Sequence, residues 1–498
     1  MNSLNKIKTN LFLTIVFFAF INSYSQVPDT GLENINSKSL MQTVQTLCSS
    51  EFDGRLPGSE GYNKAAQFAA DKFYELGLWY AGDEQYFHYL NVEYNKIESP
   101  AIFKTIVDGD TVNGVIGKDF VLRGFTGSNS FTLPVVFCGY GISRSDLHYD
   151  DYAGVNVKNK IVMVFKQNPK WKNDDKDWGT NYPREKSLVA KKHGAKGILF
   201  VSLPNDEKPQ PLIGSVMHGE GEQPVDFPQL HISLDAANTL LSNTGFSVSD
   251  CQTKIDEKKK PFSMNLTTKT QIEVNASYEK KARTMNVIGM IEGSDPKLKN
   301  EFVIIGAHLD HVGSQAGLLF PGANDNASGS AGVLEIAKAF VKGGLQPMRS
   351  VIFVLFASEE QGLYGAKHFV ESWKKGYDKI TAMINLDCVG YGDSIQVGNG
   401  KSAPILWQIA KENDETSFNS MVERTWSGGG ADATPFHEKG IPCLYFVTTN
   451  SYDHLHLSTD KVETLNPVLY EKVVKLAHLT VLEIVNGNYI REEVVKVE

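Results

Sequence analysis

From about residue 285 to the end, the chain alternates apolar runs of strand length with longer segments of helical periodicity. The expected strands are 285–291, 302–310, 350–358, 380–387 and 441–447, and the expected helices are 327–341, 363–374 and 467–485. Nearly continuous apolar strands separated by helices are typical of a mainly parallel sheet that is covered on both faces. This pattern predicts an α/β fold for the carboxyl-terminal part of the chain.

Residues 1–25 have the features of an export signal. Lys6 and Lys8 precede an apolar run that ends at Ile21, and small residues follow it. The run is well short of the roughly 20 residues that a membrane-spanning helix needs, so we expect a cleaved signal rather than an anchor. The mature chain is therefore expected in the periplasm or outside the cell, without a membrane partner.

The rest of the chain divides into three parts. Residues 26–95 contain an amphipathic segment, 63–76, that predicts a helix. Residues 96–280 consist of short β-like runs separated by glycines and charged turns, which predicts a β-rich insert. Residues 281–498 hold the alternation of strands and helices and would form the main domain. A chain of this length exceeds one ordinary domain of roughly 100–200 residues, so more than one unit is expected.

Charge, cysteine content and missing motifs narrow the function classes. The 49 basic and 58 acidic residues give a net charge of −9, and the charges are not grouped by sign, so nucleic-acid binding has no electrostatic support. The five cysteines include no CxxC pair, which indicates neither a zinc knuckle nor a disulfide scaffold. A serine hydrolase with a GxSxG elbow and a metalloprotease of the HExxH type are disfavoured, because both motifs are absent.

Residues that can bind a metal stand at the carboxyl ends of three of the expected strands, or directly after them, and in two loops of the same region. They are His308, Asp310, Glu359, Glu360 and Asp387 at strand ends, Asp325 in the loop GANDNASG and His456 in HLHLSTD. Ligands of an open α/β sheet bind outside the carboxyl ends of its strands. Adjacent glutamates at the end of a buried strand repel each other and lose hydration unless a cation compensates. Histidines and carboxylates converging on one rim suit a borderline metal such as zinc.

Five motifs in residues 285–485 carry a specific resemblance. In order, they are GAHLDHVG, GANDNASG, SEEQGLYGA, NLDCVG and HLSTD. Together they resemble metallopeptidase family 28, which includes secreted bacterial aminopeptidases and glutamate-carboxypeptidase-like enzymes. The loop GRLPGSEG resembles the amino-terminal segment of that family, and residues 96–280 resemble a protease-associated domain. The resemblance implies a mainly parallel mixed sheet with helices on both faces, of the zinc-exopeptidase, phosphorylase/hydrolase-like type, with this domain inserted.

The resemblance also implies a catalytic centre with two Zn2+ ions. The implied ligands are His308 and Asp387 for one ion, Glu360 and His456 for the other, and Asp325 as the bridge. A water shared by two such ions is nucleophilic at neutral pH. Glu359 would be the general base, which takes the proton of this water and passes it to the leaving amine.

Two further residues are expected to support the centre. Asp310 would orient the second ring nitrogen of His308, as a matching aspartate does in the family. Asp432 matches an aspartate that precedes the strand entry PF…GIP. The family also places a cis peptide after the bridging aspartate, so the bond between Asp325 and Asn326 is expected to be cis.

One position departs from the family pattern. Several members have a tyrosine directly before the last ligand histidine, where this chain has Leu455, and Tyr452 is the candidate replacement from the same loop. His311 and His454 flank ligand positions. Each can be either a hydrogen-bonded structural histidine or a direct ligand.

The function implied is that of an exported di-zinc exopeptidase acting on peptides or proteins, with aminopeptidase activity preferred because small exported members commonly act at the amino end. A carboxypeptidase or dipeptidase of the same family remains an alternative, since the sequence does not determine which end is held. A single-zinc glutaminyl cyclase and an inactive binding protein are the competing classes. The complete ligand set argues against both. Oligomeric state is not determined by the sequence.

Overall fold

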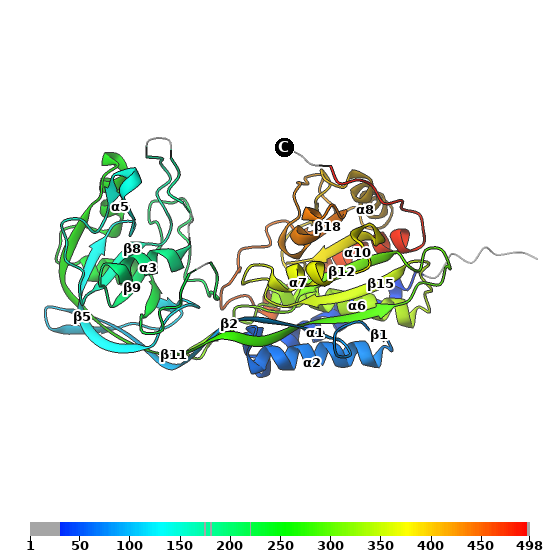
Figure 1. Ribbon diagram of the computed structural model, residues 1–498, viewed down its shortest axis with the longest axis horizontal. Coiled ribbons are helices and arrows are strands. Elements are labelled where there is room, and N and C mark those ends of the chain that lie inside the picture. Colours follow the sequence, from blue (N-terminus) through cyan, green and yellow to red (C-terminus); the bar gives the residue numbers. More distant parts are fainter. Residues whose placement is uncertain (1–29, 174–175, 180–181, 220, 496–498) are drawn as a thin grey trace, which may run out of the picture.

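The computed structural model describes residues 30–495, apart from 174–175, 180–181 and 220. The expected export signal therefore lies outside the described residues. Two lobes lie side by side, and two long strands, β2 (Phe87–Val107) and β11 (Ser263–Ile291), connect them (Figure 1). These strands pair with each other, and one continuous 14-stranded sheet extends through both lobes.

The sheet of the larger lobe is mixed and mainly parallel, as the apolar runs predicted. Its strand order is β17, β18, β16, β12, β15 and β11. The four strands from β18 to β15 are parallel, whereas β17 and β11 pair antiparallel on either side of them. The bounds are β12 Phe302–His308, β15 Ser350–Phe356, β16 Ile380–Leu386, β17 Ile395–Gly398 and β18 Cys443–Thr448. The predicted α/β fold class is confirmed.

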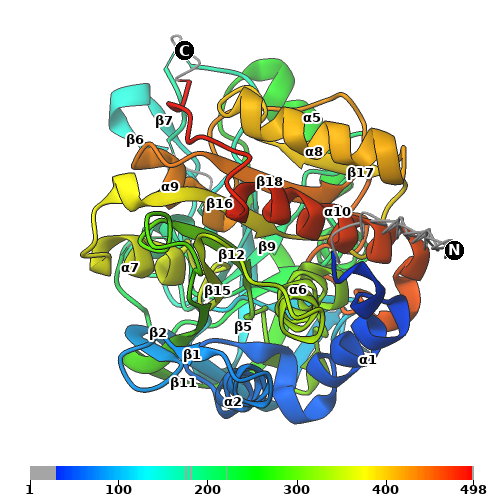
Figure 2. The same ribbon diagram turned by 90° about the vertical axis from the view of Figure 1, so that its right-hand side faces the viewer.

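Helices cover both faces of this sheet. Their bounds are α1 Ser37–Leu47, α2 Glu60–Glu75, α6 Gly329–Lys342, α7 Tyr364–Ser372, α8 Pro404–Ser417, α9 Thr434–Glu438 and α10 Pro467–Val485. In β12, Ile305 belongs to the core beneath α1, α2, α6 and α10, whereas its neighbour Ile304 belongs to the core beneath α7 and α9. Figure 2 shows α6 and α7 on opposite sides of β12 and β15. Because both faces are covered, every residue of β12, β15, β16, β17 and β18 is buried, and most of these residues are apolar.

The four helices expected from the sequence are all present, with ends within three residues of the expected ones. α10 begins at Pro467, and the side chain of Asn466 accepts a hydrogen bond from the Leu469 N–H as its cap. α2 begins at Glu60 rather than at residue 63, because the Ser59 hydroxyl caps the helix there. The helices α1, α8 and α9 were not expected.

The smaller lobe has its own sheet order, β5, β8, β9, β10 and β4, of which the first four are parallel. The strand bounds are β4 Phe120–Leu122, β5 Asn129–Cys138, β8 Ile161–Phe165, β9 Gly197–Val201 and β10 Gln229–Ile232. The helices are α3 Pro183–Lys192, α4 Leu234–Leu241 and α5 Val248–Lys258. The insert is rich in strands, as expected, but α4 and α5 were not anticipated. Apolar cores lie on both sides of this sheet.

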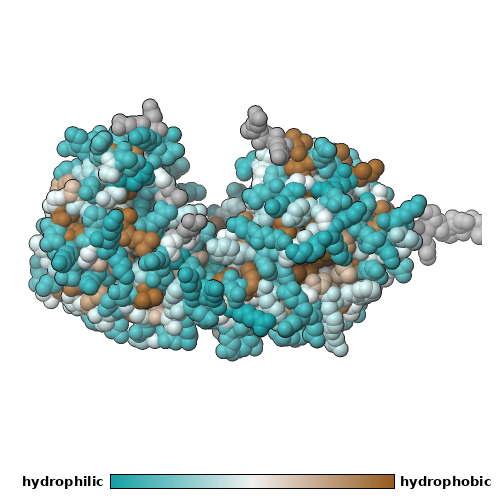
Figure 3. Space-filling view, in the orientation of Figure 1, coloured by the Kyte–Doolittle hydropathy of each residue, from teal (hydrophilic) through white to brown (hydrophobic). Residues whose placement is uncertain are grey.

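The remaining strands are short and lie at edges and in loops. They are β1 Trp79–Tyr80, β3 Asp110–Asn113, β6 Ser143–Arg144, β7 Tyr149–Asp150, β13 Ser314–Gln315 and β14 Leu318–Leu319. The expected domain boundaries at 95–96 and 280–281 both fall inside the connecting strands β2 and β11. A hollow separates the two lobes on the face seen in Figure 3. Within the described residues, every helix is too short or too polar to cross a membrane.

Candidate metal centre

The candidate ligands converge at the carboxyl ends of three adjacent parallel strands. His308 is the last residue of β12, Asp387 follows β16, and the pair Glu359 and Glu360 follows β15. Asp325 comes from a short irregular helical segment, η4 (Ala323–Ser328), that leads into α6. The apolar strands fix the backbone, and the polar residues begin where the strands end. This is the position at which an α/β sheet binds its ligands.

Asp325 lies between two histidines, and each of its carboxylate oxygens faces a different one. Asp325 Oδ1 is 3.3 Å from His308 Nε2, which is also 3.4 Å from Asp387 Oδ1. Asp325 Oδ2 is 3.2 Å from His456 Nε2, which is 2.8 Å from Glu360 Oε2. The five residues thus form two groups of three that share Asp325, which is the grouping expected from the sequence.

A third histidine belongs to the second group. His311 Nδ1 is 3.0 Å from Glu360 Oε1 and 3.5 Å from Asp325 Oδ2, and its ring packs edge-on against that of His456 at 5.6 Å. His311, Asp325 and Glu360 are spaced closely enough to hold one ion. The geometry therefore allows His311 either to fix Glu360 by a hydrogen bond or to bind metal. His454, by contrast, pairs with Thr459 Oγ1 at 2.9 Å, outside both groups.

The donor set fits a divalent cation. Asp325 Oδ2 and Asp387 Oδ1 are both buried and accept no hydrogen bond of good geometry from the described residues. Unpaired buried carboxylate oxygens are costly unless a cation compensates. Imidazole nitrogens and carboxylate oxygens in two groups that share one carboxylate suit zinc, which accepts both donor types.

Burial and mutual repulsion also act on the other acids of the centre. Burial raises the pKa of Asp310 to about 7 and raises the pKa values of Glu359 and Asp432 well above their usual range. Asp432 lies in η6 (Ala431–Ala433), and neither of its carboxylate oxygens has a hydrogen-bond partner among the described residues. These three carboxyl groups therefore favour the protonated form unless a bound cation compensates their charge.

Asp310 contacts its neighbours differently from the expected arrangement. The nearest acceptor to His308 Nδ1 is the backbone oxygen of Asp310, at 3.1 Å, whereas the carboxylate lies 3.8 Å away. The Asp310 carboxylate instead accepts hydrogen bonds from the N–H groups of Glu359 (3.1 Å) and Glu360 (3.4 Å). Its side chain therefore positions the two glutamates, and its backbone orients the histidine.

Two residues that support the candidate ligands were missed by the sequence reasoning. Asp460 accepts hydrogen bonds from the N–H groups of Asn324 (2.9 Å) and Asp325 (3.0 Å) and so fixes the bridging residue. Tyr445, in β18, donates a hydrogen bond to Asp387 Oδ2 at 2.8 Å. A signal existed for Asp460, which ends the same HLSTD motif as His456. The peptide bond between Asp325 and Asn326 is cis, as the resemblance predicted.

Arg55 is a third residue that the sequence reasoning missed. Its guanidinium is buried and donates four hydrogen bonds to backbone oxygens, at 2.7 to 2.9 Å. The acceptors belong to Leu47, Leu309, Pro321 and Gly322. Arg55 therefore ties together the loop after β12 and the loop before Asp325. Its place in GRLPGSEG was the only sequence signal.

Tyr452 and Leu455 lie at the rim. Tyr452 is 54% exposed and lies beside Tyr445, and Leu455 is 36% exposed. Tyr452 is thus close to the Asp387 side of the centre and reachable from solvent.

The smaller lobe contacts the region of the candidate metal centre at two places. The N–H of Gly214 donates a hydrogen bond of 2.7 Å to the backbone oxygen of His456, and the ring of His218 lies against the backbone at Gln361 and Gly362. A second contact runs through Glu93, whose carboxylate pairs with Arg184 at 2.8 Å. The insert therefore borders the route to the candidate ligands.

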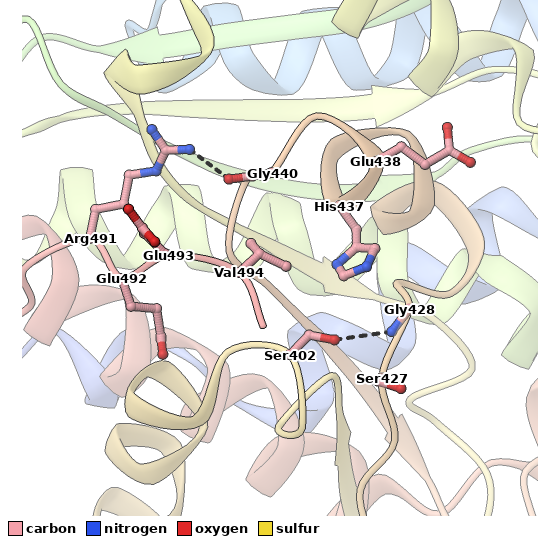
Figure 4. Close-up of a pocket in the computed structure, with 10 residues that line it drawn as sticks. All are labelled: Ser402, Ser427, Gly428, His437, Glu438, Gly440, Arg491, Glu492, Glu493 and Val494. Atoms are coloured by element: carbon pink, nitrogen blue, oxygen red, sulfur yellow. Dashed lines mark hydrogen bonds between the residues drawn. The ribbon is translucent and has the colours of Figure 1, made fainter. Parts of the chain in front are cut away.

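A separate hollow of about 730 Å³ lies beside the carboxyl-terminal end of the described chain (Figure 4). It is bordered by Ser402 and the Gly428 loop, by His437 of α9 and by the chain from Arg491 to Val494. None of the candidate ligands lines it. The metal-binding chemistry is therefore placed at the strand ends and not in this hollow.

The sheet and the two histidine and carboxylate groups define the class: an α/β protein with a candidate metal centre and an inserted lobe. Residues 286–481 match the model of Peptidase family M28, and residues 131–240 match the PA domain. Residues 286–481 therefore form a domain of peptidase family M28, and residues 131–240 form a PA domain that precedes it in the chain.

Individual relatives agree with this assignment. Leupeptin-inactivating enzyme 1 of Streptomyces exfoliatus is 35% identical over 32% of this chain and 34% of its own length. A "Probable leucine aminopeptidase" of Arthroderma benhamiae is 27% identical over 36% of this chain and 53% of its own length. The matched parts thus span a third to about half of these relatives. The structure of a zinc aminopeptidase from Bacillus subtilis superposes with a TM-score of 0.63 at 19% identity, covering 93% of this chain and 98% of that one, which shows a common fold.

Proposed function

We propose that the protein is an exported, zinc-dependent aminopeptidase with two metal sites that share Asp325. The observation that carries the proposal is the placement of the two Asp325 oxygens, each 3.2–3.3 Å from a different histidine nitrogen. The family assignment supports a peptidase, and two relatives are named as a leucine aminopeptidase and a zinc aminopeptidase. Export rests on the signal expected in residues 1–25.

The proposed ligands form two groups, which are those that the interatomic distances define. His308, Asp387 and one oxygen of Asp325 would hold one ion, and His456, Glu360 and the other oxygen of Asp325 would hold the second. When bound, zinc ions in such a pair make a shared water acidic and polarise the carbonyl of the scissile bond. Tyr445 would keep Asp387 oriented, and Asp460 would keep Asp325 in place.

Glu359 is proposed as the general base. Its backbone is fixed, because its N–H donates to Asp310 and its carbonyl oxygen accepts from the N–H groups of Gly362 and Leu363 at 2.9 Å. No described group donates a hydrogen bond to its carboxylate. Burial raises the pKa of this carboxyl well above its usual range, which favours proton uptake. The carboxylate would accept the proton of the attacking water and deliver it to the leaving amine.

Charge favours the amino end of a peptide over the carboxyl end. The centre contains the carboxyl groups of Asp310, Asp325, Glu359, Glu360, Asp387 and Asp432. Two bound divalent cations would favour the ionised form of these carboxyl groups, so that their four positive charges would be met by up to six negative ones. A centre without net positive charge accommodates the free ammonium group of a substrate better than a free carboxylate.

The test is a set of matched peptides that differ only at their ends. An aminopeptidase cleaves peptides with a free amino end, tolerates an amidated carboxyl end and fails when the amino end is acetylated. Cleavage that requires a free carboxyl end would instead assign a carboxypeptidase. Loss of ammonia from an amino-terminal glutamine, without cleavage, would assign a glutaminyl cyclase.

A further inference from the structure

Three basic side chains gather inside the smaller lobe. Arg123 follows β4, Lys166 follows β8, and His231 lies in β10. They are nearly inaccessible, with exposed fractions of 5% for Arg123, 6% for Lys166 and 1% for His231. Ser202, after β9, lies with its hydroxyl 2.9 Å from His231 Nε2. We call Arg123, Lys166 and His231 the basic cluster.

The basic cluster lacks the partners that buried cations normally have. Nε and Nη1 of Arg123 and Nδ1 of His231 have no hydrogen-bond partner among the described residues. Lys166 Nζ donates to a neutral acceptor, the side-chain oxygen of Gln210, at 2.5 Å. No ion pair within the described part of the chain includes any of the three side chains. The three basic side chains thus lie together, and none of them is paired with a carboxylate among the described residues.

Other buried arginines of the chain have the hydrogen-bond partners that Arg123 lacks. Arg184 pairs with Glu93 at 2.8 Å, and Arg349 pairs with Glu301 at 2.8 Å. Arg55 has no carboxylate but fills its donors with backbone oxygens. Arg123 has neither arrangement. A buried guanidinium with open donors is destabilising unless something binds to it.

The pKa values within the basic cluster also indicate that a compensating negative charge is missing. Burial, and then the charge of Arg123, lower the pKa of Lys166 well below its usual range. Burial, followed by the charges of Lys166 and Arg123, does the same to His231. The side chains repel one another, so an anion placed among them would interact favourably with all three at once.

We propose that the basic cluster binds a small oxyanion or carboxylate. The planar guanidinium of Arg123 presents paired donors that match two oxygens of such a group, and a bound anion would favour the protonated form of Lys166. His231 Nδ1 and the Ser202 hydroxyl supply further polar contacts. The ligand must be small, because the surrounding side chains are buried.

The position of the basic cluster connects it to the candidate metal centre. Gln210 accepts hydrogen bonds from Lys166 through its side chain and from Ser202 through its backbone oxygen, at 2.7 Å for the latter. Four residues later, Gly214 donates to the backbone oxygen of His456. Four residues of extended chain span at most about 14 Å. An anion in the basic cluster would therefore stabilise a segment that contacts the proposed ligand loop, an effect on activity that rests on the proposed function.

Two sources of anion fit this chemistry: a free inorganic oxyanion and the terminal carboxylate of a short peptide. Thermal unfolding of the full, zinc-loaded chain at constant ionic strength separates them, with sodium phosphate and N-acetylglycine as probes. N-acetylglycine has a free carboxylate and a blocked amino end. The variants are Arg123→Met and Lys166→Met, which remove charge and keep volume. Arg349→Met is the control, because it also removes a buried arginine, but one that has a carboxylate partner.

The proposal predicts a saturable rise of several degrees in the unfolding midpoint of the wild type and of Arg349→Met, and no such rise in Arg123→Met or Lys166→Met. A response to phosphate alone identifies an inorganic anion, and a response to N-acetylglycine identifies a peptide carboxylate. His308→Ala, which disables the proposed metal centre, should keep the response, so binding at zinc is distinguished from binding at the basic cluster. Equal responses in wild type and Arg123→Met would overturn the proposal. An Arg123→Met variant that is more stable than wild type at every anion concentration would also overturn it.

Discussion

At the ends of strands, the two lobes bury side chains of opposite charge. The larger lobe places carboxylates there, around His308 and His456, and the smaller lobe places Arg123 and Lys166 there. In both places, buried polar atoms lack partners among the described residues. The apolar strands provide the same rigid support, and the sign of the residues after them decides which ligand is attracted. The larger lobe therefore suits cations, and the smaller lobe suits an anion.

The largest expected effect separates the adjacent glutamates of the larger lobe. Glu359→Gln should lower kcat by about 10²–10⁴ and leave zinc bound, because a general base is lost but no ligand is. Glu360→Gln should lower zinc content, because an amide replaces a charged ligand that lies 2.8 Å from His456 Nε2. Zinc analysis and kcat on the same preparations decide this. If Glu359→Gln lost zinc while Glu360→Gln kept it, the two roles would be exchanged.

A smaller effect is expected at Arg55, the buried arginine that needs no counterion. Arg55→Met should lower the free energy of unfolding by about 3–5 kcal/mol, because several buried backbone oxygens lose their donors. Urea unfolding measures it. Arg144→Met is the matched control: Arg144 pairs with Asp146 at the surface, where a loss of about 0.5 kcal/mol or less is expected. Equal losses at both sites would show that Arg55 does not hold the ligand loops together.

The smaller lobe also buries an acid whose titration is measurable. Burial raises the pKa of Asp151 to about 7, above an unfolded value of about 3.9. The unfolded chain therefore releases this proton first, and the stability contributed by the protonated carboxyl is lost as pH rises through about 7. The free energy of unfolding should fall by roughly 2–4 kcal/mol between pH 4 and pH 7 in wild type relative to Asp151→Asn. Parallel profiles in this window would contradict the shift.

Lys186, in the same lobe, should change the free energy of unfolding with pH in the opposite direction and over a different pH range. Burial lowers its pKa to about 7, so the stability associated with the neutral amine is present above the unfolded pKa and is lost as pH falls toward about 7. Its contribution lies between about pH 7 and 10.5, outside the window used for Asp151. The charges of the two groups also affect each other's pKa, so the Lys186 profile is measured in the Asp151→Asn variant.

The smallest effect concerns the contact between the lobes. His218→Ala removes a ring that lies against the backbone at Gln361 and Gly362 and should raise KM about tenfold or less, with little change in kcat. His193→Ala is the control, because each of the two histidines packs against a tyrosine of the smaller lobe, His218 against Tyr182 and His193 against Tyr152. An equal fall of kcat and kcat/KM in His218→Ala would place the insert in the chemistry rather than in substrate access.

The sequence predicted most of the larger lobe because its signals are local. Strands buried on both faces appear as apolar runs, and Asn466 with Pro467 marks the start of α10. β11 was expected at 285 but begins at Ser263, because its earlier part alternates polar and apolar residues on a partly solvated ribbon. α4 and α5 were missed in the insert, where short runs hide helical periodicity.

The ligands of the candidate centre were predictable because they stand in sequence motifs. The residues that hold these ligands in place were not, because their contacts join parts of the chain that are distant in the sequence. Arg55 donates to Leu309, 254 residues away, and such a contact has no local signature. Tyr445 looks like any other residue of an apolar strand until its hydroxyl is seen beside Asp387. The basic cluster also unites residues from three separate strands, so only the fold brings Arg123, Lys166 and His231 together.

The central claim is that Asp325 joins two metal sites, and zinc content tests it most directly. The account predicts about two zinc ions per chain in the wild type, loss of both in Asp325→Ala and loss mainly of one in His308→Ala, because His308 lies in only one group. Metal analysis after dialysis, with activity measured on the same samples, gives the answer. One zinc ion per chain with full peptidase activity, or unchanged zinc content in Asp325→Ala, would contradict the account.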